Sequence, residues 1–382
     1  MSPAQTPPDV IERVRRRLAG SGRAATPAGV ASLVRDEVGG LLGDADLLRL
    51  VSRAQAELVG AGPLEPLLRD PEVTDVLVNA PDQVWVDRGH GLQRVPVRFA
   101  DEAAVRRLAQ RLATAAGRRL DDAQPWVDAP LPDGSRLHAV LPPIAPAGTC
   151  LSLRVLRPAG FTLDELVRAG TLTVLAAALV SAVVAARLSF LVTGGTGSGK
   201  TTLLGSLLGL VGAGERIVVV EDSAELRPVH PHVVRLVARP PNVERAGEVT
   251  LRDLVRQALR MRPDRLVVGE VRGAEVVDLL AALNTGHGGG GTVHANRAGE
   301  LPARLEALAA LGGLDRDALH SLLGAAVRVV LHVRRRPGGL RVLDEVCLLD
   351  SAGGRVAAVP AWRRDGAACP AAAELTRLVG AG

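Results

Sequence analysis

The segment that most constrains this chain is Gly194–Thr202, which reads GGTGSGKTT. It fits the phosphate-loop pattern G-x-x-x-x-G-K-[ST]. In this pattern the glycines let backbone N–H groups curl around a β-phosphate, the lysine neutralises phosphate charge, and the hydroxyl binds Mg²⁺. The apolar run 188–193 before the segment and the helical spacing of 201–210 after it predict the strand, turn and helix that the motif requires.

A chance match is the alternative to a nucleotide site, and the composition weighs against it. Lys200 is the only lysine among 46 basic residues. Because the wide planar fork of arginine would fit a phosphate cradle poorly, a lysine kept at this one position favours phosphate binding. The nucleotide-binding residues that the motif predicts are Gly194, Gly195, Thr196, Gly197, Ser198, Gly199, Lys200, Thr201 and Thr202.

Length and composition set the class of protein. The 382 residues suffice for two or three domains, and 47% hydrophobic against 23% charged residues indicates a globular chain. The net charge of +5 is weak evidence for nucleic acid, because the basic residues are interleaved with 41 acidic ones. Three Phe, three Trp and no Tyr would supply few platforms for base stacking. We therefore expect no nucleic-acid partner.

The cysteines and the apolar stretches indicate the compartment. Cys150, Cys347 and Cys369 form no C-x-x-C pair, so we expect neither a zinc site nor a disulfide framework, and a reducing cytosol. The start of the chain lacks the apolar core of a signal peptide. The most apolar stretch, 172–186, is shorter than the roughly 20 residues that span a bilayer. Any association with a membrane is therefore expected to be peripheral.

The order of the predicted elements divides the chain into four parts. Residues 1–60 read as a disordered tail (1–8) and a small helical domain, 61–157 as an α+β amino-terminal domain, 158–165 as a linker, and 166–382 as the nucleotide-binding domain. The helices expected in the first part are 10–18, 28–38 and 45–59. In the second part we expect strands at 73–78, 84–87, 92–99, 135–141 and 150–156, and a helix at 101–116. In the last part strand and helix patterns alternate, which predicts an α/β fold with a parallel-rich sheet. The strands expected there are 188–193, 216–221, 233–237, 265–270, 291–294, 327–334, 341–349 and 355–359.

Two acids stand at the exits of these strands, where open α/β sheets place their ligand groups. Glu270 can orient and deprotonate an attacking water; the alternative is a solvated residue at a strand end. Glu221 can hold Mg²⁺ through water or position the nucleophile. The alternative for the exit of the strand 216–221 is ordinary helix capping by Asp222 or Ser223.

A third feature is the stretch 283–296, which reads LNTGHGGGGTVHAN. Its glycines indicate a backbone that approaches a ligand closely, and they bring His287 and His294 close to the flanking Asn284 and Asn296. A metal site would need a third strong ligand, so a histidine pair that senses the γ-phosphate or orders a subunit edge is favoured. A flexible loop is the alternative.

Together these motifs resemble the secretion ATPases of type II and type IV systems. The segments GGTGSGKTT, VVEDSAEL, ALRMRPDRLVVGEVRGAE and NTGHGGGGTVHAN come in the order of that family's Walker A loop, aspartate box, Walker B and histidine box. The match is closest to the tight-adherence (Flp pilus) assembly type. GPLEPLLRDPEVTDVLVN, LPDGSRLHAVLPP and FTLDELVRAGTL are also similar to its amino-terminal domain and linker. The resemblance implies a RecA-like ATPase domain.

The resemblance also implies roles for single residues. Lys200 and Thr201 would contact phosphates and Mg²⁺, Glu221 would act in the aspartate box, and Glu270 would be the catalytic glutamate. His287 and His294 would be γ-phosphate and interface histidines. Arginines from which a neighbouring subunit's phosphates could be reached are Arg154, which matches a family arginine near nucleotide, and Arg260, Arg262 and Arg272.

For the assembly, the resemblance implies six subunits in a ring, with ATP held between the amino- and carboxyl-terminal domains. The motor would act at the inner face of the cell membrane on a platform that assembles or secretes pilin. The histidine box is one residue shorter than in the tight-adherence type. The lack of paired C-x-x-C motifs separates the chain from the branches that carry zinc. Two readings stay open beside the motor: a helicase or conjugative DNA pump, and a nucleotide-dependent scaffold that barely hydrolyses ATP.

Overall fold

The structure is a computed structural model that describes residues 7–21, 26–39, 42–155, 160–241 and 246–380. The chain forms two compact units, 1–157 and 158–382, which we describe separately. Most of the expected tail, 1–8, and the start of the expected linker, 158–165, lie outside the described residues. The end of that linker stretch already belongs to the helix α6 (Leu163–Arg168).

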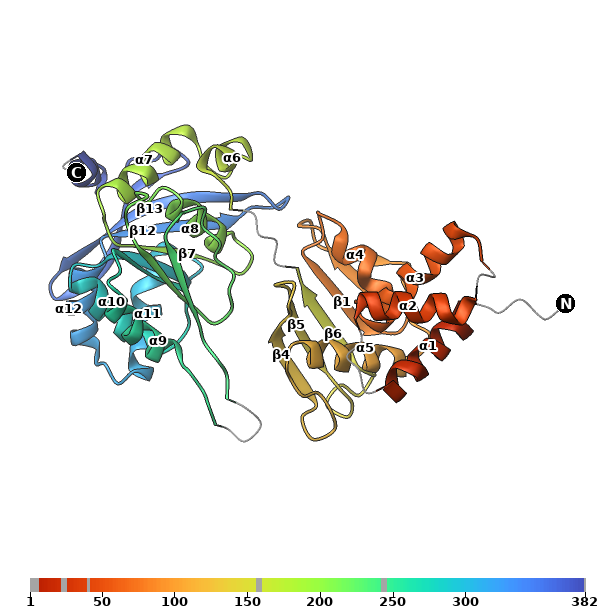
Figure 1. Cartoon of the computed structure of the whole chain (residues 1–382). Coiled ribbons are helices and arrows are strands. Elements are labelled where there is room, and N and C mark those ends of the chain that lie inside the picture. The colour runs from red at the N-terminus through yellow and green to blue at the C-terminus, as the bar shows by residue number, and fades with distance from the viewer. Residues whose placement is uncertain (1–6, 22–25, 40–41, 156–159, 242–245, 381–382) are drawn as a thin grey trace. The chain divides into compact units, whose positions relative to one another are not determined.

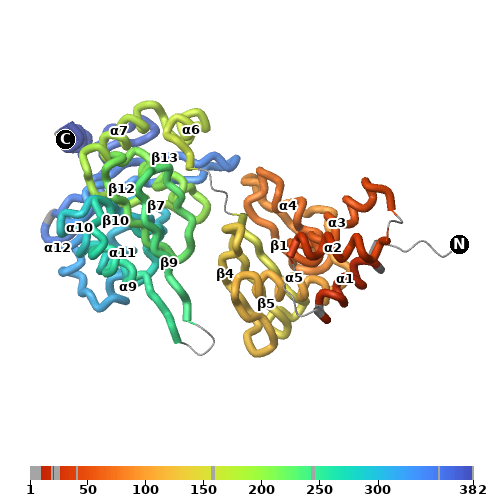
Figure 2. Tube along the Cα trace, viewed as in Figure 1, coloured from red at the N-terminus to blue at the C-terminus, as the bar shows by residue number. Residues whose placement is uncertain are grey.

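The first unit begins with three helices (Figure 2), and their buried side chains form a small apolar core. They are α1 (Pro7–Ser21), α2 (Pro27–Val38) and α3 (Asp44–Leu58). The hydroxyl of Thr26 accepts the N–H of Gly29 at the start of α2, and Gly39 ends that helix in the left-handed region. Helices were predicted in all three places from periodicity, and this is confirmed.

An antiparallel sheet follows in the same unit, in the strand order β3-β2-β1-β6-β5-β4. Its elements are η1 (Gly62–Leu64), α4 (Glu65–Arg69), β1 (Asp75–Ala80), β2 (Gln83–Asp87), β3 (Leu92–Val95), α5 (Glu102–Ala115), β4 (Trp126–Pro130), β5 (Arg136–Val140) and β6 (Cys150–Arg154). The apolar face of α5 packs on the sheet. The sequence pattern missed β4, whose Pro130 is tolerated because this strand lies at the edge.

The second unit is built on an eight-stranded sheet in the order β14-β13-β12-β7-β11-β10-β8-β9. The strands from β12 to β9 in that order run parallel, and β12, β13 and β14 pair antiparallel. Their bounds are β7 (Phe190–Gly194), β8 (Ile217–Glu221), β9 (Val233–Val237), β10 (Arg265–Val271), β11 (Gly288–His294), β12 (Val329–Arg335), β13 (Arg341–Ala352) and β14 (Arg355–Arg363).

Helices cover both faces of this sheet (Figure 1). One face packs against α9 (Leu251–Ala258), α10 (Glu275–Asn284), α11 (Leu301–Leu311) and α12 (Arg316–Ala326). The other face packs against α6, α7 (Val174–Ala185), α8 (Lys200–Leu208) and α13 (Ala372–Gly380). Two 3-10 turns, η2 (Leu259–Met261) and η3 (Ala298–Glu300), complete the unit. The predicted α/β fold class with a parallel-rich sheet and an α+β amino-terminal domain is confirmed.

The glycine run has a different purpose from the one expected. Gly288–Gly291 is neither a flexible loop nor a ligand-facing segment but the first half of β11, buried between β10 and β7. A Cβ on Gly289 would lie 1.9 Å from the carbonyl oxygen of Leu266, and one on Gly290 would lie 1.8 Å from that of Phe190. Glycine is therefore required because the neighbouring backbones leave no room for a side chain.

We predict that Gly290→Ala destabilises the second unit severely. No flexible side chain can move aside, because the clash is with backbone, so the free energy of unfolding should fall by more than about 4 kcal/mol. Thermal unfolding followed by circular dichroism measures this. Gly299→Ala is the matched control, since a Cβ there meets nothing within 4 Å. Equal melting temperatures for the two variants would contradict the packing argument.

Candidate nucleotide-binding site

The phosphate loop joins the end of β7 to the start of α8. Gly197 and Gly199 have φ of 67° and 97°, values that favour glycine. A Cβ on Gly194 would lie 2.3 Å from the carbonyl oxygen of Val333 on β12. The Ser198 hydroxyl donates to the carbonyl oxygen of Gly195 at 2.8 Å and closes the turn. The loop thus presents the amino-terminal end of α8, where anions are favoured.

The side chain of Lys200 is folded back onto this loop. Its Nζ donates to the carbonyl oxygens of Gly194 and Gly195, each at 3.1 Å, and only 8% of the residue is exposed. Burial lowers the pKa of the ammonium, and the nearby carboxylate of Glu270 opposes this effect. The ammonium of Lys200 is bonded to two neutral carbonyl oxygens. A phosphate would be a stronger acceptor than either of them, because it is charged.

The parallel register places the predicted residues along one edge of the sheet. His294 pairs with Gly194 across β11 and β7, and Glu221 ends β8 on the same side as Glu270 near the end of β10. His287 lies apart, because it precedes β11 and so stands at the opposite edge. Six residues of strand, 288–293, lie between the two histidines, which corresponds to roughly 20 Å. Within one chain the structure therefore does not bring His287 to the loop.

Glu270 is half-buried and is held by an ion pair. Its Oε2 accepts a hydrogen bond from the guanidinium of Arg272. The turn that carries this arginine is fixed by Glu275, whose Oε1 accepts the backbone N–H groups of Arg272 at 2.6 Å and of Gly273 at 2.8 Å. Sequence reasoning missed the buried Glu275, although an acid shortly after a strand exit is a usable signal for such a turn.

Glu221 is buried, with 3% of its surface exposed. Its Oε1 accepts the N–H groups of Glu225 at 3.1 Å and Leu226 at 2.8 Å, while its buried Oε2 has no hydrogen-bond partner among the described residues. Burial raises the pKa of this carboxyl to about 7. In the described chain no helix starts directly after β8, so helix capping by Asp222 or Ser223 is wrong. The turn is organised by Glu221 itself.

Two further side chains complete the surroundings of the loop and gave no signal in the sequence. Nδ1 of His332, a buried residue on β12, lies 3.0 Å from the hydroxyl of Thr193. Arg341 begins β13, and its Nε donates to the carbonyl oxygen of Gly197 at 3.0 Å. Both come from strands far along the chain that the sheet topology places beside β7.

The predicted arginines lie in different parts of the chain. Arg154 ends β6 in the first unit, where its Nε donates to Asp75 at 3.1 Å. Arg260 lies in η2, and Arg262 follows it with φ of 54°. Of the predicted arginines, Arg272 is the one that contacts a predicted site residue. The roles of the others stay predictions.

The residues at this edge fit a nucleotide with Mg²⁺. Glycines leave the loop backbone open, Lys200 supplies a buried cation, and the hydroxyl of Thr201 stands at the start of α8. The unpartnered Oε2 of Glu221 is an acceptor of the hard-oxygen type that Mg²⁺ or its bound water prefers. Separately, the described residues hold no group of three or more His, Cys, Asp or Glu side chains that could by itself bind a metal ion.

Comparison with known proteins agrees with the fold and the site. Residues 57–341 match the family described as type II/IV secretion system protein. A putative conjugal transfer protein of Mycobacterium tuberculosis is 66% identical, over 85% of this chain and 94% of that protein. The type IV secretion system protein PtlH of Bordetella pertussis is 32% identical, over 80% of this chain and 95% of that protein.

A solved structure supports the fold. The pilus retraction motor PilT with bound ADP has a TM-score of 0.52 and 20% identity, over 78% of this chain and 80% of that chain. The family match and the 66% identical relative show that the chain belongs to the type II/IV secretion system protein family. It has the RecA-like fold of a secretion ATPase. The resemblance to that superfamily is confirmed, whereas the tight-adherence type stays a prediction. Across the described residues, no helix combines the length and the apolar character needed to cross a membrane.

We predict a pH dependence of stability that originates at Glu221. Its pKa rises from 4.5 to about 7 on folding, so the folded chain binds the proton more tightly and the free energy of unfolding falls as pH rises through this window. Glu221→Gln keeps an acceptor for the two N–H groups and removes the titration. The free energy of unfolding of the variant minus that of the natural chain should therefore increase by about 2 kcal/mol as the pH rises from about 5 to about 8.

Urea unfolding without nucleotide or Mg²⁺ measures this difference. The control is Glu248→Gln, which changes an exposed acid of the same unit. Parallel stability curves for the natural chain and Glu221→Gln across this pH range would show that Glu221 is not the group responsible.

Proposed function

We propose that this chain hydrolyses ATP as a motor of a secretion or pilus assembly system. The observation that carries the proposal is the arrangement at the carboxyl ends of three neighbouring parallel strands. The phosphate loop with Lys200 follows β7, His294 ends β11, and Glu270 lies near the end of β10. Membership of the type II/IV secretion system family supports it. The quoted motifs favour the tight-adherence type, in which the motor moves pilin.

The chemistry follows from the positions of the chain's own groups. Lys200 would leave its two carbonyl partners and bind the β- and γ-phosphates, and the N–H groups at the start of α8 would hold the β-phosphate. Glu270 would accept a proton from the attacking water, with Arg272 holding the carboxylate in place. Thr201 and Glu221 would hold Mg²⁺, which neutralises phosphate charge.

The assembly is proposed on the same resemblance. Six subunits would form a ring at the inner face of the cell membrane and act on a membrane platform. Arg154 of the first unit and His287, which precedes β11 and so lies at the strand end opposite the loop, would then act at subunit contacts. The relatives described as conjugal transfer and type IV secretion proteins support a role in export.

The decisive experiment compares ATP hydrolysis and light-scattering mass for three chains. Lys200→Ala should lose ATP binding and turnover together, because the only cation inside the loop is removed. Glu270→Gln should still bind ATP but turn over at least about 100-fold more slowly, because the general base is lost. In the natural chain, turnover should rise with assembly into a six-subunit species.

Glu248→Gln serves as the control for loss of an acid, since Glu248 is exposed in the same unit. If ATP binds and rings form but no turnover depends on Lys200, the chain acts as a nucleotide-dependent scaffold instead. Unchanged turnover in Glu270→Gln would remove the general base from the proposal.

The two histidines should behave differently. His294→Ala is expected to lower kcat about tenfold or more, because His294 lies beside Gly194 at the phosphate edge. His287→Ala should leave the Kd of a non-hydrolysable ATP analogue within about twofold and change the light-scattering mass, since its strand end faces away from that edge. Titration of both variants measures this. Equal weakening of analogue binding would place both histidines at one nucleotide.

A second candidate function is a motor that translocates DNA, which the conjugal transfer relatives favour. The composition weighs against it, because stacking platforms are few. Single-stranded DNA would stimulate hydrolysis by a translocating motor, in a manner that falls steeply with salt. If the rate of ATP hydrolysis does not change with single-stranded DNA, the DNA-translocating motor is excluded and the secretion motor stands.

A further inference from the structure

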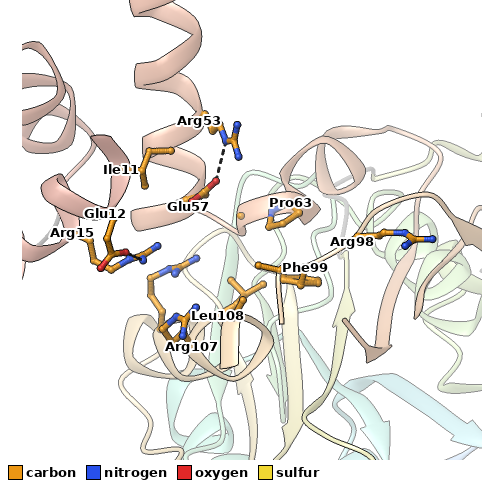
Figure 3. A pocket seen from close by; sticks show the side chains of 14 residues that line it. Ile11, Glu12, Arg15, Arg53, Glu57, Pro63, Arg98, Phe99, Arg107 and Leu108 are labelled. Carbon is orange, nitrogen blue, oxygen red and sulfur yellow. Dashed lines mark hydrogen bonds and ion pairs between the residues drawn. The ribbon is translucent and has the colours of Figure 1, made fainter. Parts of the chain in front are cut away.

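The first unit contains a cavity of about 540 Å³ between its amino-terminal helices and α5, the helix that packs on the sheet (Figure 3). One wall comes from α1 and α3, and the other comes from η1, the segment before α5, and α5 itself. This volume lies in the range of sites for small organic ligands. Nothing in the motor mechanism uses this cavity.

Arginine dominates its charged lining. Five arginines and two glutamates contribute, namely Arg15, Arg53, Arg98, Arg107, Arg111, Glu12 and Glu57. Arg15 pairs with Glu12, and Arg53 pairs with Glu57 at 3.1 Å. Figure 3 shows Arg98 extending away from the other labelled side chains. Among the described residues, the two lining arginines of α5 form no ion pair with a carboxylate of the cavity lining.

These two charges, Arg107 and Arg111, stand one helical turn apart on α5. Like charges at this spacing repel each other. Arg107 lies 3.9 Å from Asp101, but that carboxylate is outside the cavity lining and accepts the N–H of Ala104 at 2.7 Å as the helix cap. A bound anion between them would remove the repulsion.

Arg111 is the less satisfied of the pair. Its Nη2 donates to the carbonyl oxygen of Gly60 at 2.7 Å, while its buried Nε has no hydrogen-bond partner among the described residues. Burial lowers its pKa to about 10, and the charge of Arg15 lowers it further while Glu57 opposes this. The guanidinium groups of Arg15 on α1 and Arg111 on α5 are thus close enough to repel each other.

The rest of the wall is apolar. The aromatic ring of Phe99 and the pyrrolidine ring of Pro63 lie across from Arg15 and Arg107, and Leu108 lies between Arg107 and Phe99 (Figure 3). Guanidinium groups bind phosphate in a bidentate manner, whereas a wall of apolar rings suits a ring system. A ligand with both parts matches the cavity better than a simple anion does.

We propose that this cavity binds a small phosphate-bearing ligand with a flat ring, of the nucleotide class, as a second site apart from the phosphate loop. The phosphate contacts Arg107, Arg111 and Arg15, and the ring packs against Phe99 and Pro63. Because the walls come from α1 and α3 on one side and from α5 on the other, the ligand joins the helical part to the sheet.

Calorimetric titration of the full chain with AMP tests this proposal. AMP lacks the β- and γ-phosphates that Lys200 reaches, and the titration is run on Lys200→Ala so that the phosphate loop contributes little. We expect saturable binding that is at least tenfold tighter than that of inorganic phosphate and of adenosine. Adding Arg107→Gln should weaken AMP binding at least tenfold, because it removes a charge that contacts the phosphate. The side chain is partly exposed, so the substitution does not disturb the core.

Arg106→Gln is the matched control, since it removes the same charge from the preceding position of α5, which does not line the cavity. Binding that survives in Arg106→Gln but is lost in Arg107→Gln supports the site. Equal affinity for AMP and inorganic phosphate would overturn the role of the rings. Absence of saturable binding, or equal binding by both arginine variants, would overturn the proposal.

Discussion

The second unit depends on the close contact of three backbones at the centre of its sheet. Gly289 and Gly290 bring β11 against Leu266 on one side and Phe190 on the other, at distances that admit no side chain. This contact fixes the register in which His294 meets Gly194. The same register carries the ends of β10 and β8 to that edge, so the positions of Glu270 and Glu221 relative to the loop follow from a contact that involves none of the reactive groups.

Three charged side chains of the protein share one physical property. Among the described residues, buried Lys200 and partly buried Arg111 donate to backbone carbonyl oxygens, and burial lowers the pKa of each. Glu221 is the acidic counterpart: one oxygen accepts N–H groups, and the other is buried with no hydrogen-bond partner among the described residues. In each case the folded chain has already removed water from the group, so a ligand of opposite charge gains more there than at an exposed site.

Much of the fold and of the site could be predicted from local patterns. Short apolar runs gave most strands, and the spacing around Lys200 gave the loop, because these signals act within a few residues. The glycine run was misread because glycine weakens strands in general, and only the neighbours in the sheet reveal why it is needed here. For the same reason His287 was paired with His294, although the strand between them places the two histidines at opposite strand ends. Arg341 and His332 could not be foreseen, since strand order alone places them beside the loop.

Lys200 has a consequence that reaches beyond nucleotide chemistry. As the only lysine of the chain, it carries the only side-chain amine, and that amine is folded into the loop with a lowered pKa. An acylating reagent therefore meets, apart from the chain's first residue, a single amine target. Protection of that target reports occupancy of the phosphate loop alone, so the composition of this protein provides a covalent reporter without any engineered label.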